Sequence, residues 1–196
     1  VPAAAWIVIG AALLLALLSL RGDRDRAAYV SRRLAERLDD SNCPPATVIV
    51  PVKGHDDHLA DNLRSLAALD YPDYELIVVA RAAADIPEGV VPARARVAIA
   101  GEAAAGTGEK IHNLMAGVEA ERGASTVYAF ADSDNVVPSG WLRALVAPLG
   151  EAGVGLSTGY RWHVPSTPGT WALLRSMWNS VIAGGFREGA NQFAWG

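Results

Sequence analysis

The hydrophobic positions of the chain follow three successive patterns. Residues 1–20 are apolar throughout, with no charge and a single hydroxyl at Ser19. Residues 21–45 are rich in arginine and end in the helix-breaking run Ser41-Asn42-Cys43-Pro44-Pro45. From residue 46 onward, short apolar runs alternate with stretches of helical periodicity. We therefore predict a transmembrane anchor over 1–20, a basic juxtamembrane helix and linker over 21–45, and a folded domain over 46–196.

The first segment is long enough to cross a bilayer, because about 20 apolar residues span the hydrocarbon core as a helix. A cleaved signal peptide is the rival interpretation, but its basic start and small-residue cleavage site are not visible. Arginines follow the segment at once, and the positive-inside rule places them in the cytoplasm. They are Arg21, Arg24, Arg26, Arg32, Arg33 and Arg37. Apolar residues between them favour a basic amphipathic helix lying on the membrane, with an ordinary solvated helix as the alternative.

The remaining pattern predicts an α/β fold with a mostly parallel sheet flanked by helices. Short runs that are apolar on both faces, separated by helices, are typical of such sheets. We expect strands near residues 47–50, 76–79, 96–99, 127–130 and 154–157. Four helix faces are expected at Leu59, Leu63 and Leu66; at Ile111, Leu114, Met115 and Val118; at Leu142, Leu145, Val146 and Leu149, with Ser139 as the N-cap; and at Trp171, Leu174, Trp178 and Val181.

Composition narrows the possible partners. The chain is 51% hydrophobic and 19% charged, which excludes a disordered chain. The net charge of -4 provides no basic field, so we expect no nucleic acid partner. A single cysteine, Cys43, excludes an internal disulfide and a cysteine-based zinc cluster.

Candidate chemistry lies at the ends of the predicted strands, because open α/β sheets bind ligands at the carboxyl ends of their strands. The first strand ends in Pro51-Val52-Lys53-Gly54, Asp85 follows the second, and Asp132-Ser133-Asp134 follows the strand at 127–130. Residues i and i+2 of an extended chain point the same way, so Asp132 and Asp134 can share a divalent cation. The alternative is a turn closed by Asp134-Asn135. A second triplet, Asp23-Arg24-Asp25, shows how weak the motif is alone.

Two other segments carry weaker signals. Residues 101–110 (GEAAAGTGEK) faintly resemble a phosphate-binding loop but lack a lysine followed by Ser or Thr after the second glycine. His55, Asp56, Asp57 and His58 could suggest zinc, although aspartate is also a routine residue at the start of a helix.

Six segments together resemble family 2 glycosyltransferases of the GT-A fold, and within them the ceramide glucosyltransferase-like branch with its bacterial hopanoid-type relatives. The resemblance covers about residues 46–196. The segments are Thr47–Gly54, Asp61–Leu63, Leu69–Pro72, Tyr74–Leu76, Lys110–Leu114 and Asp132–Asp134.

The resemblance implies a nucleotide-sugar site in this domain. Pro51 and Val52 would line the uracil pocket beside Lys53, and Asp85 or a neighbour would hold uracil or ribose. Lys110 would approach the nucleotide or its phosphates. Asp132 would contact the donor and, with Asp134, hold Mg²⁺ or Mn²⁺. Arg81-Ala82-Ala83-Ala84 stands where the family usually has an early aspartate.

The resemblance also implies an activity and a place. A UDP-sugar would donate glucose or N-acetylglucosamine, with inversion, to a lipid acceptor such as ceramide or hopanoid. The expected location is a bacterial-type inner (cell) membrane, with the catalytic domain cytoplasmic. The family's acidic catalytic base is expected beyond residue 196, so the chain resembles a C-terminally truncated transferase. The alternative is a non-catalytic, membrane-tethered nucleotide-sugar-binding domain.

Overall fold

The computed structural model describes residues 3–35, 40–54, 56–159, 165, 167 and 169–183. They belong to two units: Arg37–Val154 forms one compact unit, and Val1–Glu36 with Gly155–Gly196 forms the other. The first of these carries the sheet. In the second, the described regular structure consists of two helices, α1 (Ala3–Ala35) and α5 (Thr170–Ala183).

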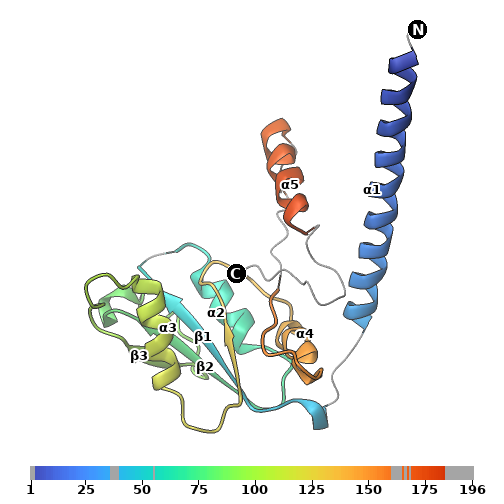
Figure 1. Ribbon diagram of the computed structural model, residues 1–196. Helices are drawn as coiled ribbons and strands as arrows, with labels where there is room; N and C mark the ends of the chain where they lie inside the picture. Colours follow the sequence, from blue (N-terminus) through green and yellow to red (C-terminus); the bar gives the residue numbers. More distant parts are fainter. Residues whose placement is uncertain are drawn as a thin grey trace. The chain divides into compact units, whose positions relative to one another are not determined.

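The compact unit is built on a four-stranded sheet in the order β3-β2-β1-β4 (Figure 1). The strands are β1 (Ala46–Val52), β2 (Tyr74–Ala80), β3 (Arg96–Ile99) and β4 (Val127–Phe130). All three pairings are parallel, and Val48 of β1 lies opposite both Leu76 of β2 and Ala129 of β4. The predicted α/β class with a mostly parallel sheet is therefore confirmed.

Two helices cover one face of the sheet, namely α2 (Leu59–Ala67) and α4 (Trp141–Val146). The predicted face of α2 is buried completely, since Leu59, Leu63 and Leu66 have almost no exposed surface. Burying a leucine side chain stabilises a fold by about 1.5–3 kcal/mol. Helix α4 ends sooner than its apolar spacing predicts, because it is followed by a 3₁₀ turn (Ala147–Gly150) that contains Pro148. Its N-cap is Gly140 and not the predicted Ser139.

The other face is covered by α3 (Glu109–Glu119), which packs on Ile49, Ile77 and Val79 (Figure 1). The predicted buried face of this helix is only half right. Leu114 and Val118 pack against the sheet, but Ile111 and Met115 are 55% and 57% exposed. The residues buried most deeply are Asn113 and Gly117. The buried face of α3 therefore includes a small and a polar residue. The spacing of apolar residues alone cannot predict such a face.

The edge strands also differ from the prediction of strands that are apolar and buried on both faces. Only β1 and β2 are buried on both sides, whereas alternate residues of β3 and β4 are exposed. The predicted strand at 154–157 is wrong, because these residues have no strand pairing and Leu156 is 70% exposed. An apolar run becomes a strand only where it finds a neighbour to pair with.

The two helices of the other unit both contain apolar stretches. In α1, residues Ala5–Gly22 are long enough and apolar enough to cross a membrane, and within the described residues this is the one helix that meets both conditions. The helix continues unbroken through the arginine-rich stretch to Ala35. A basic helix lying in the membrane plane would need a bend between the two segments. The predicted last helix forms as α5, with both tryptophans, Trp171 and Trp178, exposed.

Gly117 marks the closest approach of α3 to the sheet. A Cβ added there would lie 2.5 Å from Cγ2 of Ile49 and 3.0 Å from Cγ2 of Val79. Alanine favours a helix over glycine by about 1 kcal/mol, but overpacking a core costs about 1–3 kcal/mol. We therefore expect Gly117→Ala to lower the free energy of unfolding, as measured by urea denaturation in detergent.

Gly150 provides the control for that substitution. It is exposed at the end of the 3₁₀ turn, its φ is not positive, and an added Cβ would meet nothing within 4 Å. Gly150→Ala should leave stability within about 0.5 kcal/mol of wild type, the usual range for a surface change. If Gly117→Ala proved as stable as Gly150→Ala, the close contact would be wrong.

Candidate active site

A pocket of about 440 Å³ opens where β1, the start of α3 and the loop after β4 meet. It holds six of the seven predicted site residues, every one except Asp85. Its lining consists of Pro51, Val52, Lys53, Glu109, Lys110, Asn113, Asp132, Ser133 and Asp134.

The parallel pairing of β1 with β4 brings these residues together. Ile49 lies opposite Phe130, and the pairing continues one step further because the Ala131 amide donates to the Ile49 carbonyl at 3.1 Å. One step further along, Asp132 comes level with Pro51 near the end of β1, so the loop after β4 and the end of β1 meet at the same edge of the sheet. In a parallel sheet this is the edge at which ligands bind.

Both lysines of the chain lie in this pocket and pair with carboxylates. Lys53 Nζ lies 2.9 Å from Oε2 of Glu109, and Lys110 Nζ lies 2.5 Å from Oδ1 of Asp132. The Lys110 side chain is 62% exposed. Exposed ion pairs stabilise a fold by about 0–1 kcal/mol, so these pairs orient the pocket more than they hold the domain together.

A buried hydrogen bond positions the backbone of the Asp132-Ser133-Asp134 loop. Asn62 of α2 is fully buried and donates from Nδ2 to the Asp132 carbonyl at 2.8 Å. Ser65, one turn later, accepts a hydrogen bond from the Val137 amide at 3.1 Å and donates to the Asn62 carbonyl at 2.8 Å. Helix α2 therefore holds the loop at two points, from the face of the sheet that α2 and α4 cover.

Asp85 is the predicted site residue that the pocket does not include. Its carboxylate accepts from the Ala82 amide at 3.2 Å and lies 3.3 Å from Nε of Arg81. This contact raises the pKa of the Arg81 guanidinium above its ordinary value, mainly through the hydrogen bond. The Asp85 carbonyl accepts from the Gly54 amide at 3.1 Å, and Gly54 takes a φ of +69° that glycine adopts without strain.

Asp132 and Asp134 are the pocket residues that could hold a divalent cation such as Mg²⁺. Among the described residues no group of three or more His, Cys, Asp or Glu side chains could hold a metal ion. Mg²⁺ needs only one or two carboxylates when phosphate oxygens and water complete its shell, so Asp132 and Asp134 suit it. In the rival histidine group, Asp56 accepts from the His58 amide at 2.8 Å just before α2, as a helix-starting residue does, while His55 lies outside the described residues.

Sequence reasoning missed three residues of this site, Asn62, Glu109 and Asn113. Both asparagines lie on helix faces that otherwise bury apolar side chains. A polar residue within an apolar stripe was the available signal, because buried amides are retained only where they find partners.

A model of glycosyl transferase family 21 matches residues 4–178. The chain belongs to glycosyl transferase family 21. The match spans most of α1, the whole sheet and the first part of α5.

Membership of family 21 confirms that the predicted chemistry is glycosyl transfer. Such a transferase takes a sugar from an activated donor and passes it to an acceptor. The assignment to family 2 and the ceramide glucosyltransferase-like branch stay predictions. A comparison with curated protein sequences finds no match.

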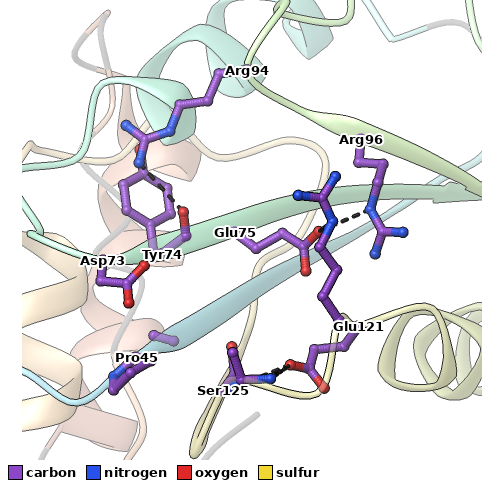
Figure 2. A pocket seen from close by; sticks show the side chains of 11 residues that line it. Pro45, Asp73, Tyr74, Glu75, Arg94, Arg96, Glu121 and Ser125 are labelled. Atoms are coloured by element: carbon purple, nitrogen blue, oxygen red, sulfur yellow. Dashed lines mark hydrogen bonds and ion pairs between the residues drawn. The ribbon is translucent and has the colours of Figure 1, made fainter.

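This family 21 chain has a second pocket, of about 280 Å³, at the amino ends of β1 and β2. Figure 2 shows the residues that line it. Arg96 Nε lies 2.8 Å from Oε1 of Glu75, as an ion pair without hydrogen-bond geometry, and Arg122 Nε lies 3.5 Å from the same oxygen. Arg94 stacks 3.8 Å above the centre of the Tyr74 ring. These guanidinium groups already have partners.

Charges within this second pocket also balance, with Asp73, Glu75 and Glu121 against three arginines. It lies at the amino ends of the strands, whereas ligands of parallel sheets bind at the carboxyl ends. The pocket around Asp132 is therefore the candidate active site.

The contacts predict which substitutions the fold will tolerate. Because the Lys110–Asp132 pair is exposed, Lys110→Met and Asp132→Asn should each change the free energy of unfolding by less than about 1 kcal/mol. Asn62→Ala should cost about 1–3 kcal/mol, since it removes a buried hydrogen bond to the loop. Urea denaturation of the three variants checks this order. An Asp132→Asn loss as large as that of Asn62→Ala would contradict it.

Proposed function

We propose that this family 21 chain transfers a sugar from a UDP-sugar to the hydroxyl group of a membrane lipid, with inversion and with a divalent cation. The donor sugar is glucose or N-acetylglucosamine, and the acceptor is a lipid such as ceramide or hopanoid. One observation carries the proposal. A single pocket at the carboxyl edge of the sheet combines an apolar wall, two lysines and two neighbouring aspartates.

Each group in the pocket suits one part of a UDP-sugar. Pro51 and Val52 offer an apolar wall for the uracil ring. Lys53 and Lys110 offer ammonium groups, which bind phosphate as point charges. The lysines keep these positions through their pairs with Glu109 and Asp132, and a diphosphate would compete for the same ammonium groups.

The aspartates suit a magnesium or manganese ion. Asp132 and Asp134 supply carboxylate oxygens on one loop, and the diphosphate would supply others. A cation bound there would neutralise the charge that develops on the departing diphosphate. The Asn62 hydrogen bond holds the loop in place, so the carboxylates need little rearrangement.

The reaction is a displacement at the anomeric carbon. The lipid hydroxyl oxygen forms the new bond, the bond from the anomeric carbon to the diphosphate oxygen breaks, and UDP leaves. A general base accepts the hydroxyl proton. Attack from the face opposite the leaving group inverts the anomeric centre.

The apolar helix α1 supports a lipid acceptor. Its segment Ala5–Gly22 is long enough to cross a bilayer, and arginines follow it directly. We place these arginines, and with them the sheet, on the cytoplasmic side of a bacterial-type inner membrane. An enzyme anchored in this way meets lipid hydroxyl groups at the surface where they are concentrated.

The first test measures donor binding by the full chain in detergent micelles. UDP with Mg²⁺ or Mn²⁺ should raise the unfolding temperature, because a ligand at 100 times its dissociation constant stabilises a fold by about 2.7 kcal/mol. The double variant Asp132→Ala plus Asp134→Ala should lose the metal-dependent part of this rise.

A matched control comes from the second triplet. Asp23→Ala plus Asp25→Ala removes two aspartates that are not among the residues lining the pocket, and it should leave the UDP response unchanged. Wild type that responds equally to ATP and UDP, or to neither, would contradict the proposal.

Transfer itself separates the enzyme from the non-catalytic alternative. Because the catalytic base is expected beyond residue 196, radiolabelled UDP-glucose or UDP-N-acetylglucosamine is incubated with the natural full-length protein and ceramide or hopanoid in mixed micelles. Labelled lipid that disappears in the Asp132→Ala plus Asp134→Ala variant supports transfer. UDP binding without labelled lipid for any donor and acceptor pair would favour a binding domain.

A further inference from the structure

Asn113 is a pocket residue to which neither the motifs nor the pocket charges give a role. It lies on α3, one turn after Lys110, and only 2% of its surface is exposed. It belongs to the pocket lining. Within the part of the chain that the structure describes, its side-chain carbonyl oxygen, Oδ1, has no hydrogen-bond partner.

An unpaired buried carbonyl is unfavourable, and nearly all buried polar atoms in proteins have a partner. The groups near Asn113 do not provide one, since both lysines of the pocket are engaged by Glu109 and Asp132. The oxygen therefore suits a hydrogen-bond donor that a ligand brings into the pocket.

The chemistry of a UDP-sugar restricts which part can be that donor. Ionised phosphate oxygens only accept hydrogen bonds, so the diphosphate cannot pair with Oδ1. The uracil ring carries an imide N–H at position 3, and ribose carries two hydroxyl groups. Both belong to the nucleoside, and the apolar residues Pro51 and Val52 line the same pocket.

Access to Oδ1 requires a side chain to move, because protein atoms cover this oxygen. Lys110 is a candidate, since residues three apart on a helix are neighbours and its side chain is 62% exposed. A diphosphate that draws Lys110 away from Asp132 would uncover the wall on which Asn113 lies.

We propose that Oδ1 of Asn113 accepts a hydrogen bond from the nucleoside of the donor, either from the uracil imide N–H or from a ribose hydroxyl. This inference rests on the proposed function, because it assumes a uridine nucleotide in the pocket. Asn113 is then a specificity residue that reads the nucleoside, while Lys110 and the aspartates serve the diphosphate.

The experiment uses isothermal titration of the full chain in detergent with Mg²⁺. The ligands are UDP, 3-methyl-UDP, 2′-deoxy-UDP, 3′-deoxy-UDP and inorganic pyrophosphate. A neutral hydrogen bond changes affinity by about three- to tenfold. Wild type should bind one analogue that much more weakly than UDP, which identifies the base or the ribose as the source. Asn113→Ala should weaken UDP by the same factor, lose that discrimination and bind pyrophosphate unchanged.

Matched variants separate this role from a structural one. Asn113→Leu keeps the branching and the number of heavy atoms and removes the unpaired oxygen, so it should raise the unfolding midpoint while it weakens UDP binding. Lys110→Met should weaken both UDP and pyrophosphate. Thr47→Val removes a buried hydroxyl that contacts Ser125 near the amino end of β1 and should change neither.

Two results would overturn the inference while leaving the proposed function standing. In one, wild type binds UDP and all three analogues equally. In the other, Asn113→Ala and Asn113→Leu bind UDP as wild type does. A wild type that binds pyrophosphate but shows no preference for UDP would instead remove the proposed function and this inference together.

Discussion

The structure depends on the pairing of β1 with a parallel strand on each side. Residues Val48, Ile49 and Val50 have no exposed surface, because β2 and β4 flank the strand and helices cover both of its faces. Burial on two faces demands helices above and below, and parallel pairing sends every strand end to the same edge. The position of the candidate active site therefore follows from how the core is made.

The loop after β4 receives support from both layers of helices. From one face, Asn62 and Ser65 of α2 hold its backbone with partly buried hydrogen bonds. From the other face, Lys110 of α3 binds the Asp132 side chain. Backbone and side chain are thus controlled by different elements, so a ligand can rearrange the exposed contact to Lys110 while the buried one keeps the loop in register. This separation of backbone and side-chain contacts suits a member of family 21, because glycosyl transfer requires both a fixed site and a donor that enters and leaves.

The fold and most of the pocket could be predicted from the sequence because they follow from local periodicity and strand order. The apolar runs located all four strands, and the strand-end rule brought Pro51, Lys53 and Asp132 together. What failed depended on neighbours distant in sequence. The run at 154–157 has no pairing strand. Helix α3 packs Gly117, and not the predicted Ile111, against Ile49 of the sheet. Asp85 stays a predicted nucleotide-binding residue; its carboxylate pairs with Arg81, and it does not line the pocket.

The paired lysines have a consequence for how fast a nucleotide arrives. Lys53 and Lys110 carry two positive charges, and Glu109, Asp132 and Asp134 carry three negative ones, so the formal balance of the lining is one negative charge. An approaching diphosphate would meet no attractive field at long range, and its association rate would gain little from low ionic strength. A divalent cation that arrives first would reverse the sign of the entrance. If the proposed function holds, this charge balance favours binding of the cation before the nucleotide.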